Sequence, residues 1–203
     1  MAGSPSGQVV LLNGASSTGK STIARQLLAD FRTPWFHMAV DMFGAMRAER
    51  QTHELDPDGI RQALYRTRAG FHRAVAGMAH AGNNIVMDHV LSEPWRLDDL
   101  LTVMIGLDVV FVGVHCSVND LTHREAARGD RPGGAALDQA ARVHAHGMYD
   151  LEVDTTAFSA EDCSNHIRAY LHQNPPPATR AFDRLRNTQP PGRGRNWSTS
   201  NLE

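Results

Sequence analysis

Short apolar runs alternate with longer amphipathic segments along the chain, and this alternation predicts strands and helices in turn. The apolar runs are rich in β-branched residues and have the length of single strands. They span residues 8–14, 36–41, 83–91, 107–116 and 151–156. The run at 107–116 is almost continuously apolar, which is typical of a parallel strand buried on both faces.

The segments between these runs show the helical spacing of apolar residues. They span residues 21–31, 57–82, 92–106, 117–129, 135–147 and 159–173, and residues 42–55 are expected to be partly helical. Ser92 is the expected N-cap of its helix and Gly106 its terminator, and Ser159 and Asp162 occupy capping-box positions. Alternating strands and helices predict an α/β fold with a parallel sheet of about five strands and helices on both faces.

The composition changes after residue 173. Residues 174–203 contain PPP, QPPGRGR and NWSTSN, which have no period and offer little to bury. We therefore expect a flexible C-terminal tail there. Residues 1–173 have the length of one domain.

Charge and cysteine usage narrow the class of protein. A net charge of −2 argues against a general nucleic-acid binder, which would carry a basic face. No apolar run approaches the ~20 residues of a membrane span, and MAGSPSGQ lacks the features of a secretion signal. Cys116 and Cys163 form no CxxC pair and are interpreted as reduced thiols. We expect a cytoplasmic protein without nucleic-acid or membrane partners, and a homo-oligomer stays open.

Residues 14–21 read GASSTGKS, a full match to G-x-x-x-x-G-K-S between a predicted strand and a predicted helix. In such a loop the backbone N–H groups point inward and the following helix N-terminus adds partial positive charge, so phosphates bind there. A glycine-rich turn without a ligand is the less favoured interpretation. The residues expected to bind the triphosphate are Gly14, Ser17, Thr18, Gly19, Lys20, Ser21 and Thr22.

Lys20 is the only lysine in the chain, where all other basic side chains besides histidine are arginine. A compact ammonium fits between two phosphates where a planar guanidinium does not. We expect Lys20 to reach the β- and γ-phosphates of ATP and the Ser21 hydroxyl to bind Mg²⁺. The motif leaves open a small-molecule kinase, a hydrolase or switch, and a non-catalytic nucleotide-binding module. A guanine-specific switch needs N-K-x-D, which a chain with one lysine in this motif cannot contain.

Asp41 and Asp88 end two of the predicted strands, and ligands of an open α/β sheet bind over the carboxyl ends of its strands. We expect both strands to neighbour the strand that precedes the loop. A kinase needs a base for the attacking hydroxyl and a carboxylate near Mg²⁺. We assign Asp41 as the base and Asp88 to the metal; the alternatives are a helix N-cap for Asp41 and an ion-paired strand end for Asp88.

THREAARGDRPGG places Arg124 and Arg128 one helical turn apart, with Arg131 in the loop beyond. Arginines on a glycine- and proline-containing loop suit a lid, over about residues 124–134, that closes on the triphosphate and stabilises the transferring phosphoryl group. We expect Arg124 and Arg128 to bind ATP, and Arg128 and Arg131 to act in catalysis with Lys20. The alternative is a solvated basic helix face paired with acidic neighbours. His144 and His146 are expected on different faces of a helix, which argues against a metal site.

At this point the chain resembles the chloramphenicol phosphotransferase family of P-loop kinases. The resembling pieces are LLNGASSTGKS, VD at residue 41, IVMDHV, DVVFVGVHC, HREAARGDR and YDLEVDTT, in family order over residues 9 to about 170. The loop is shared by many families, but its combination with REAARGDR and YDLEVDTT is more specific.

The resemblance implies a nucleoside-monophosphate-kinase-like three-layer fold and ATP-dependent, Mg²⁺-assisted phosphorylation of a hydroxyl on an antibiotic, which inactivates it. It also implies that the family's base matches Asp41 and that its lid arginines match Arg128 and Arg131. The chain departs from the family where it has Asp88 followed by His89 instead of two aspartates, and in residues 42–59. The acceptor therefore stays open between an antibiotic or another hydroxylated natural product and, as the alternative, a nucleotide, nucleoside or other metabolite.

Overall fold

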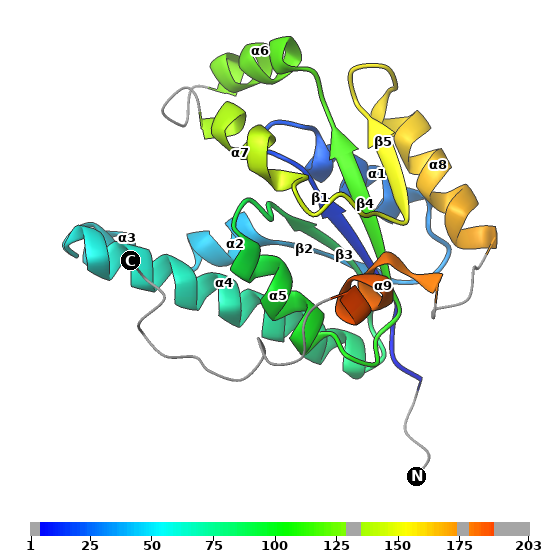
Figure 1. Ribbon diagram of the computed structural model, residues 1–203, viewed down its shortest axis with the longest axis horizontal. Coiled ribbons are helices and arrows are strands. Elements are labelled where there is room, and N and C mark those ends of the chain that lie inside the picture. Colours follow the sequence, from blue (N-terminus) through cyan, green and yellow to red (C-terminus); the bar gives the residue numbers. More distant parts are fainter. Residues whose placement is uncertain (1–4, 129–134, 174–178, 189–203) are drawn as a thin grey trace.

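The computed structural model describes residues 5–128, 135–173 and 179–188, and Figure 1 shows its ribbon. The strands form one sheet in the order β2-β3-β1-β4-β5, and every pairing is parallel. The strands are β1 (Val9–Asn13), β2 (Trp35–Ala39), β3 (Asn84–His89), β4 (Val109–His115) and β5 (Leu151–Asp154). The central strand is β1, which pairs with β3 on one side and β4 on the other.

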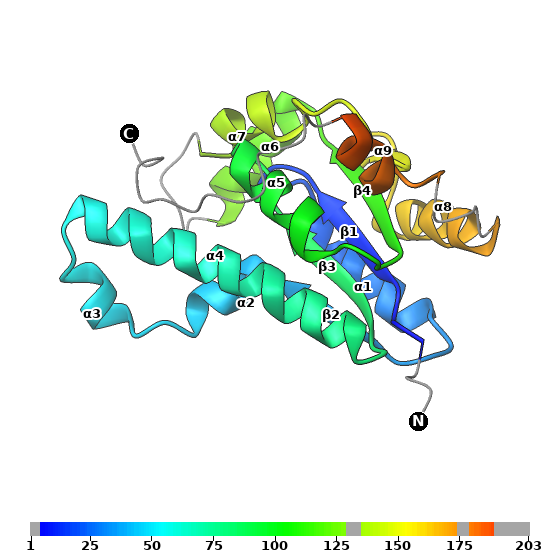
Figure 2. The same ribbon diagram turned by 60° about the horizontal axis from the view of Figure 1, so that its bottom comes forward.

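Helices cover both faces of this sheet, which gives the predicted three-layer α/β fold (Figure 1). They are α1 (Lys20–Asp30), α2 (Val40–Ala45), α3 (Glu49–His53), α4 (Pro57–His80), α5 (Pro94–Val103), α6 (Val118–Arg128), α7 (Ala135–Val143), α8 (Ala160–Gln173) and α9 (Ala181–Thr188). Figure 2 shows α2 and α3 lying along α4.

Alternate residues of each central strand enter two separate hydrophobic cores, because successive strand side chains point to opposite faces. Val9 and Leu11 of β1 pack in one core with residues of α4, α5 and α9. Val10 and Leu12 pack in the other with residues of α1 and α8. The carboxyl ends of the strands meet at one edge, beyond which α6 and α7 lie (Figure 1).

The expectation of a flexible tail is wrong for the part of it that the structure describes. Residues 181–188 form α9, whose Phe182 is buried and packs edge-on against Phe111 of β4, with ring centroids 5.2 Å apart. Arg180 is buried as well, and its Nε donates to Asp108 Oδ1 at 2.9 Å. The remainder of the predicted tail lies outside the described residues.

The predicted N-terminal cap of α8 is confirmed, whereas the predicted N-cap of α5 is wrong. Ser159 Oγ accepts from the Asp162 backbone N–H and the Ser159 N–H donates to Asp162 Oδ2, so the capping box before α8 is confirmed. The N-cap of α5, however, is Glu93, because Pro94 occupies the first helical position. Ser92 instead accepts a hydrogen bond from the Arg96 guanidinium.

None of the helices described is both long and apolar enough to cross a membrane. Both cysteines are free thiols; Cys163 is buried and Cys116 is half-buried.

Candidate active site

The loop between β1 and α1 has the backbone geometry of a phosphate cradle. Gly14 has no room for a side chain, because a Cβ there would lie 2.4 Å from the Val114 carbonyl oxygen of β4. Gly19 has a φ of 91°, in the left-handed region that favours glycine, and Ser17 adopts a φ of 65°. The two glycine positions of the motif therefore hold glycine for different reasons, a close approach at Gly14 and a turn at Gly19.

The N-terminus of α1 opens directly onto this loop. Its N-cap is Gly19, so no side chain caps the helix, and its first turn contains no acidic residue. The first backbone N–H groups of a helix lack intrahelical partners and carry partial positive charge. An anion is therefore the group that this helix end accommodates best.

Lys20 is buried in the first turn of α1, with 6% of its surface exposed. Its Nζ donates to the Ala15 carbonyl at 2.6 Å and lies 3.9 Å from Asp88 Oδ1. The ammonium thus lies inside the loop, at the position where the motif predicts contact with phosphate oxygens.

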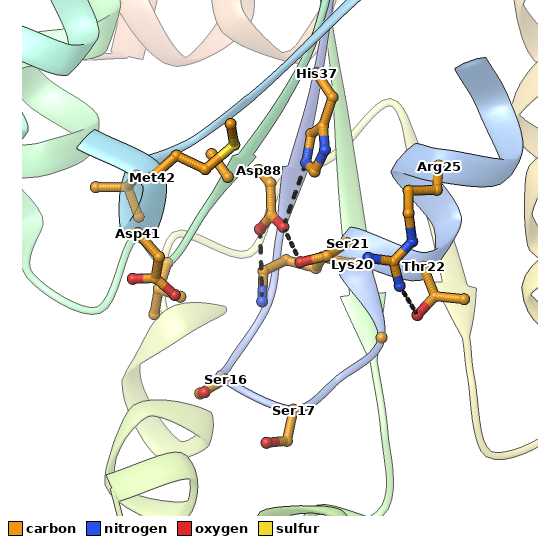
Figure 3. A pocket seen from close by; sticks show the side chains of 14 residues that line it. Ser16, Ser17, Lys20, Ser21, Thr22, Arg25, His37, Asp41, Met42 and Asp88 are labelled. Atoms are coloured by element: carbon orange, nitrogen blue, oxygen red, sulfur yellow. Dashed lines mark hydrogen bonds and ion pairs between the residues drawn. The ribbon is translucent and has the colours of Figure 1, made fainter. Parts of the chain in front are cut away.

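Asp88 is the centre of a polar cluster that Figure 3 shows in close view. The Ser21 hydroxyl donates to Asp88 Oδ2 at 2.6 Å, and His37 Nε2 of β2 lies 3.8 Å from the same oxygen. Burial alone would raise the pKa of Asp88, but His37, Lys20 and Ser21 together hold that pKa below its ordinary value. The group is therefore a carboxylate at neutral pH, and its ion pair with Lys20 matches the ion-paired alternative as well as the metal-site hypothesis.

The residues assigned to Mg²⁺, Ser21 and Asp88, are in direct contact and offer hard oxygen ligands. Among the described residues no group of three or more His, Cys, Asp or Glu side chains could hold a metal by itself. Mg²⁺ suits such a site, because it binds one or two protein oxygens, keeps several waters and takes its other ligands from substrate phosphates. The residues present therefore fit the ion.

Asp41 lies at a different place in the fold from the one predicted. It belongs to the first turn of α2, two residues beyond the end of β2, and β2 pairs with β3 rather than with β1. The strand-end position is therefore wrong for Asp41, and so is the N-cap alternative, because the N-cap is Ala39. Of the two strands to which Asp41 and Asp88 were assigned, only β3, the strand of Asp88, neighbours β1.

Asp41 nevertheless lines the same pocket as the phosphate-binding loop. This pocket has a volume of about 320 Å³. Its walls include Ser16, Ser17, Gly19, Lys20, Ser21, Thr22, Arg25, His37, Asp41, Met42 and Asp88. Figure 3 shows Asp41 on one side of it and the Lys20, Ser21 and Asp88 cluster on the other, which is the arrangement that a base and a phosphoryl donor require.

Arg124 of α6 is linked to the phosphate-binding loop through Thr155. Its guanidinium donates to the Thr155 hydroxyl at 3.0 Å and to the Thr155 carbonyl at 2.9 Å. The Thr155 hydroxyl in turn donates to the Thr18 carbonyl at 2.8 Å. The alternative of a solvated basic face is therefore wrong for Arg124. The side chain of Arg128, at the end of α6, and the whole of Arg131 lie outside the described residues.

Sequence reasoning missed His37 and Thr155. His37 lies within a strand, where its register with β3 could not be derived from the local pattern. Thr155 directly follows β5. Its place at the carboxyl end of a strand is the one feature of the sequence from which a role at the site could have been predicted. His144 and His146 do not lie on two faces of a helix, since both follow α7 and both contact the Tyr149 hydroxyl, at 2.6 and 3.1 Å.

Comparison with known proteins gives one family. A family model described as chloramphenicol phosphotransferase-like protein matches residues 7–172. A curated protein from Mycobacterium tuberculosis, named as a candidate O-phosphotransferase, is 32% identical over 206 aligned residues, which cover 92% of this chain and 91% of that protein.

Solved structures with the same fold include three kinds of protein. A tunicamycin resistance protein from Deinococcus radiodurans has a TM-score of 0.62 at 17% identity and covers 81% of this chain and 95% of its own. A sugar kinase from Janibacter sp. has a TM-score of 0.61 at 17% identity, covering 85% and 99%. The M. tuberculosis APS kinase, in complex with AMPPNP and APS, has a TM-score of 0.60 at 15% identity, covering 83% and 99%. At these identities the likeness shows the fold alone.

Proposed function

Because this chain belongs to the chloramphenicol phosphotransferase-like family and is a phosphotransferase of the P-loop kinase type, we propose that it transfers the γ-phosphoryl group of ATP to a hydroxyl of a small molecule. The acceptor class that its family favours is an antibiotic or another hydroxylated natural product, which phosphorylation would inactivate, so that the enzyme would confer resistance. A single observation supports the proposal most directly: Asp41 lines the same pocket as Lys20 and Ser21.

In the proposed reaction Asp41 accepts the proton of the acceptor hydroxyl. The freed oxygen forms a bond to the γ-phosphorus, and the bond from that phosphorus to the β,γ-bridging oxygen breaks, which releases ADP. Lys20 exchanges its contact with the Ala15 carbonyl for the phosphate oxygens and stabilises the charge that develops on them. Arg124 and Thr155 hold the lid helix against the loop, and Arg128 and Arg131 are proposed to complete the lid.

Mg²⁺, held by the Ser21 hydroxyl and through Asp88, would neutralise charge on the β- and γ-phosphates. The contribution of the chain to this site is orientation. The hydrogen bond from Ser21 to Asp88, with His37 and Lys20 on either side, fixes both oxygen ligands before the nucleotide arrives.

A mass-spectrometric screen tests the proposal. The protein is incubated with ATP, Mg²⁺ and a panel of hydroxylated antibiotics, natural products, nucleosides and sugars, and products are searched for the gain of one phosphate. We expect phosphorylated product with the wild type and none with Lys20→Ala, which removes the contact with the phosphates. Clear ATP binding without any phosphorylated product across the panel would favour a non-catalytic nucleotide-binding module and contradict the proposal.

A further inference from the structure

Three arginines from separate parts of the chain lie near one another, and one of them, Arg68, interacts electrostatically with Asp41. Arg47 follows α2, Arg68 lies in the middle of α4 and Arg96 lies in α5. The guanidinium of Arg47 donates to the Thr67 hydroxyl at 3.1 Å, next to Arg68 in the chain. Trp95, next to Arg96, packs on Tyr65, one helical turn before Arg68, with ring centroids 4.4 Å apart. These contacts bring the three side chains to the same region of α4.

Acidic side chains do not balance this positive charge. Two carboxylates, Glu93 and Asp41, act on the three arginines. Both oxygens of Glu93 are already engaged, one by the Trp95 indole N–H and the other by Arg96. Asp99, on the inner side of α5, is bonded to His72 and Arg73. Within the part of the chain described, the Arg68 side chain has no hydrogen bond and no ion pair, although Glu93, Asp41 and Arg47 act on it electrostatically.

Two guanidinium groups here have a buried Nε donor without a hydrogen-bond partner among the described residues. Arg96 is 5% exposed, and its Nε has no hydrogen-bond partner among the described residues. The same is true of the buried Nε of Arg47. Buried donors without partners are costly and are rare in proteins unless a ligand satisfies them.

The mutual repulsion of these guanidinium groups also favours a bound anion. Burial, Arg68 and Arg142 together lower the pKa of Arg96 to about 10, against the opposing effect of Glu93. Burial and Arg47 likewise lower the pKa of Arg68. A bound anion would relieve this repulsion and accept from the free donors at once.

We propose that the acceptor of this enzyme is anionic: besides the hydroxyl presented to Asp41 it carries a carboxylate or a phosphate ester, which Arg68 and Arg47 bind. Arg96 is held by Glu93, Ser92 and the Val90 carbonyl and contributes charge to the site. The proposal rests on the proposed function, and it narrows the acceptor from any hydroxylated small molecule to an acidic one.

Matched pairs of substrates test the inference. Hydroxy acids are assayed beside their primary amides, and hydroxylated phosphate esters beside their dephosphorylated forms, with ATP and Mg²⁺. We expect kcat/KM to be at least roughly tenfold higher for the acidic member of a pair, because a charge-assisted hydrogen bond is lost with the neutral one. Whichever pair shows the larger preference identifies the carboxylate or the phosphate ester as the natural group.

Arg68→Gln should lower kcat/KM for the acidic substrate by roughly ten- to hundredfold and leave kcat/KM for the neutral substrate unchanged. The preference for the acidic substrate should therefore disappear. The matched control is Arg66→Gln, which removes the same charge from an exposed position on another side of α4. Arg47→Gln is a second test and should reduce the preference as well. Equal rates for neutral and acidic members, or a preference that survives Arg68→Gln, would overturn the inference while leaving the proposed phosphoryl transfer intact.

A binding measurement decides the case in which no compound of the panel is phosphorylated. The loop is first saturated with a non-hydrolysable ATP analogue and Mg²⁺, and malonate and inorganic phosphate are then titrated by calorimetry. Binding of either anion that Arg68→Gln weakens and Arg66→Gln does not would support the anionic site, even if the proposed function fails. Absence of such binding, or a loss confined to the affinity for the ATP analogue, would contradict it.

Discussion

Asp41 and Lys20 approach the same pocket from opposite sides, and their chemical demands differ. Lys20 needs a rigid, dry place in which a single ammonium faces phosphate oxygens, and it is buried in the first turn of α1. Asp41 needs access to an incoming hydroxyl, and it is an exposed residue of α2 that lines the pocket. The difference in burial fits a donor site that is fixed and an acceptor site that opens to solvent.

Asp41→Asn should reduce kcat by about 10²- to 10⁴-fold, because the amide cannot accept the proton of the hydroxyl in the transition state. The affinity for ATP should stay within about twofold of the wild type, since Asp41 lies across the pocket from the loop. Single-turnover kinetics and ATP titration on the same preparation separate these effects. Glu49→Gln, an exposed acid in α3, is the control; retained turnover in Asp41→Asn would remove Asp41 as the base.

The residues of the phosphate-binding loop could be predicted, but the three neighbouring arginines could not. The loop is one contiguous stretch whose glycines, lysine and serine have fixed places relative to the strand and the helix. Arg47, Arg68 and Arg96 come from three segments, and nothing in their local patterns says that α2, α4 and α5 converge. Their assembly depends on contacts such as Arg47 with Thr67, which only the tertiary structure supplies.

At the scale of elements, α9 extends the fold beyond the boundary expected from the sequence. Its apolar residues occupy the free part of the sheet face next to α5, with Phe182 against Phe111. The preceding prolines and the low hydrophobicity of the surrounding sequence prevented the prediction of this helix of only two turns. Its stability comes from packing rather than from its own sequence. The sequence pattern predicted each of the five strands of the described sheet, most clearly the central ones, because a buried parallel strand has a strong local signal.

Phe182→Ala should lower the free energy of unfolding by about 3–5 kcal/mol, because it leaves a cavity in a packed core. Urea denaturation followed by circular dichroism measures this change. Asn187→Ala, on the exposed side of α9, should leave stability within about 0.5 kcal/mol of the wild type. A Phe182→Ala protein as stable as this control would show that α9 does not contribute to the core.

At the scale of the whole molecule, several buried histidines make stability depend on pH. His72 and His89 are both fully buried and lie 2.8 Å apart between their Nε2 atoms, and His72 Nδ1 lies 2.6 Å from Asp99 Oδ2. Burial lowers the pKa of both imidazoles, that of His89 furthest. Burial and His115 also lower the pKa of His144 to about 4.

A histidine whose pKa is lowered by folding binds more protons when unfolded, so stability rises with pH through that window. We expect the histidine contribution to the free energy of unfolding to reach its full value above about pH 6.5. It should fall by at least about 1 kcal/mol toward pH 5. Urea denaturation at a series of pH values measures the slope. His89→Leu should flatten it, whereas His80→Gln, at an exposed position, should not. An unchanged slope in His89→Leu would exclude His89 as a source.

The single lysine has a consequence for chemical labelling. Apart from the α-amino group, the sequence contains one primary amine, because every basic side chain other than Lys20 and the histidines is arginine. Reductive methylation with ¹³C-formaldehyde would therefore place only two isotopic probes in the protein, one of them on Lys20 inside the nucleotide site. Its resonance would report binding of the triphosphate and release of the nucleotide directly, without resonance assignment of the rest of the molecule.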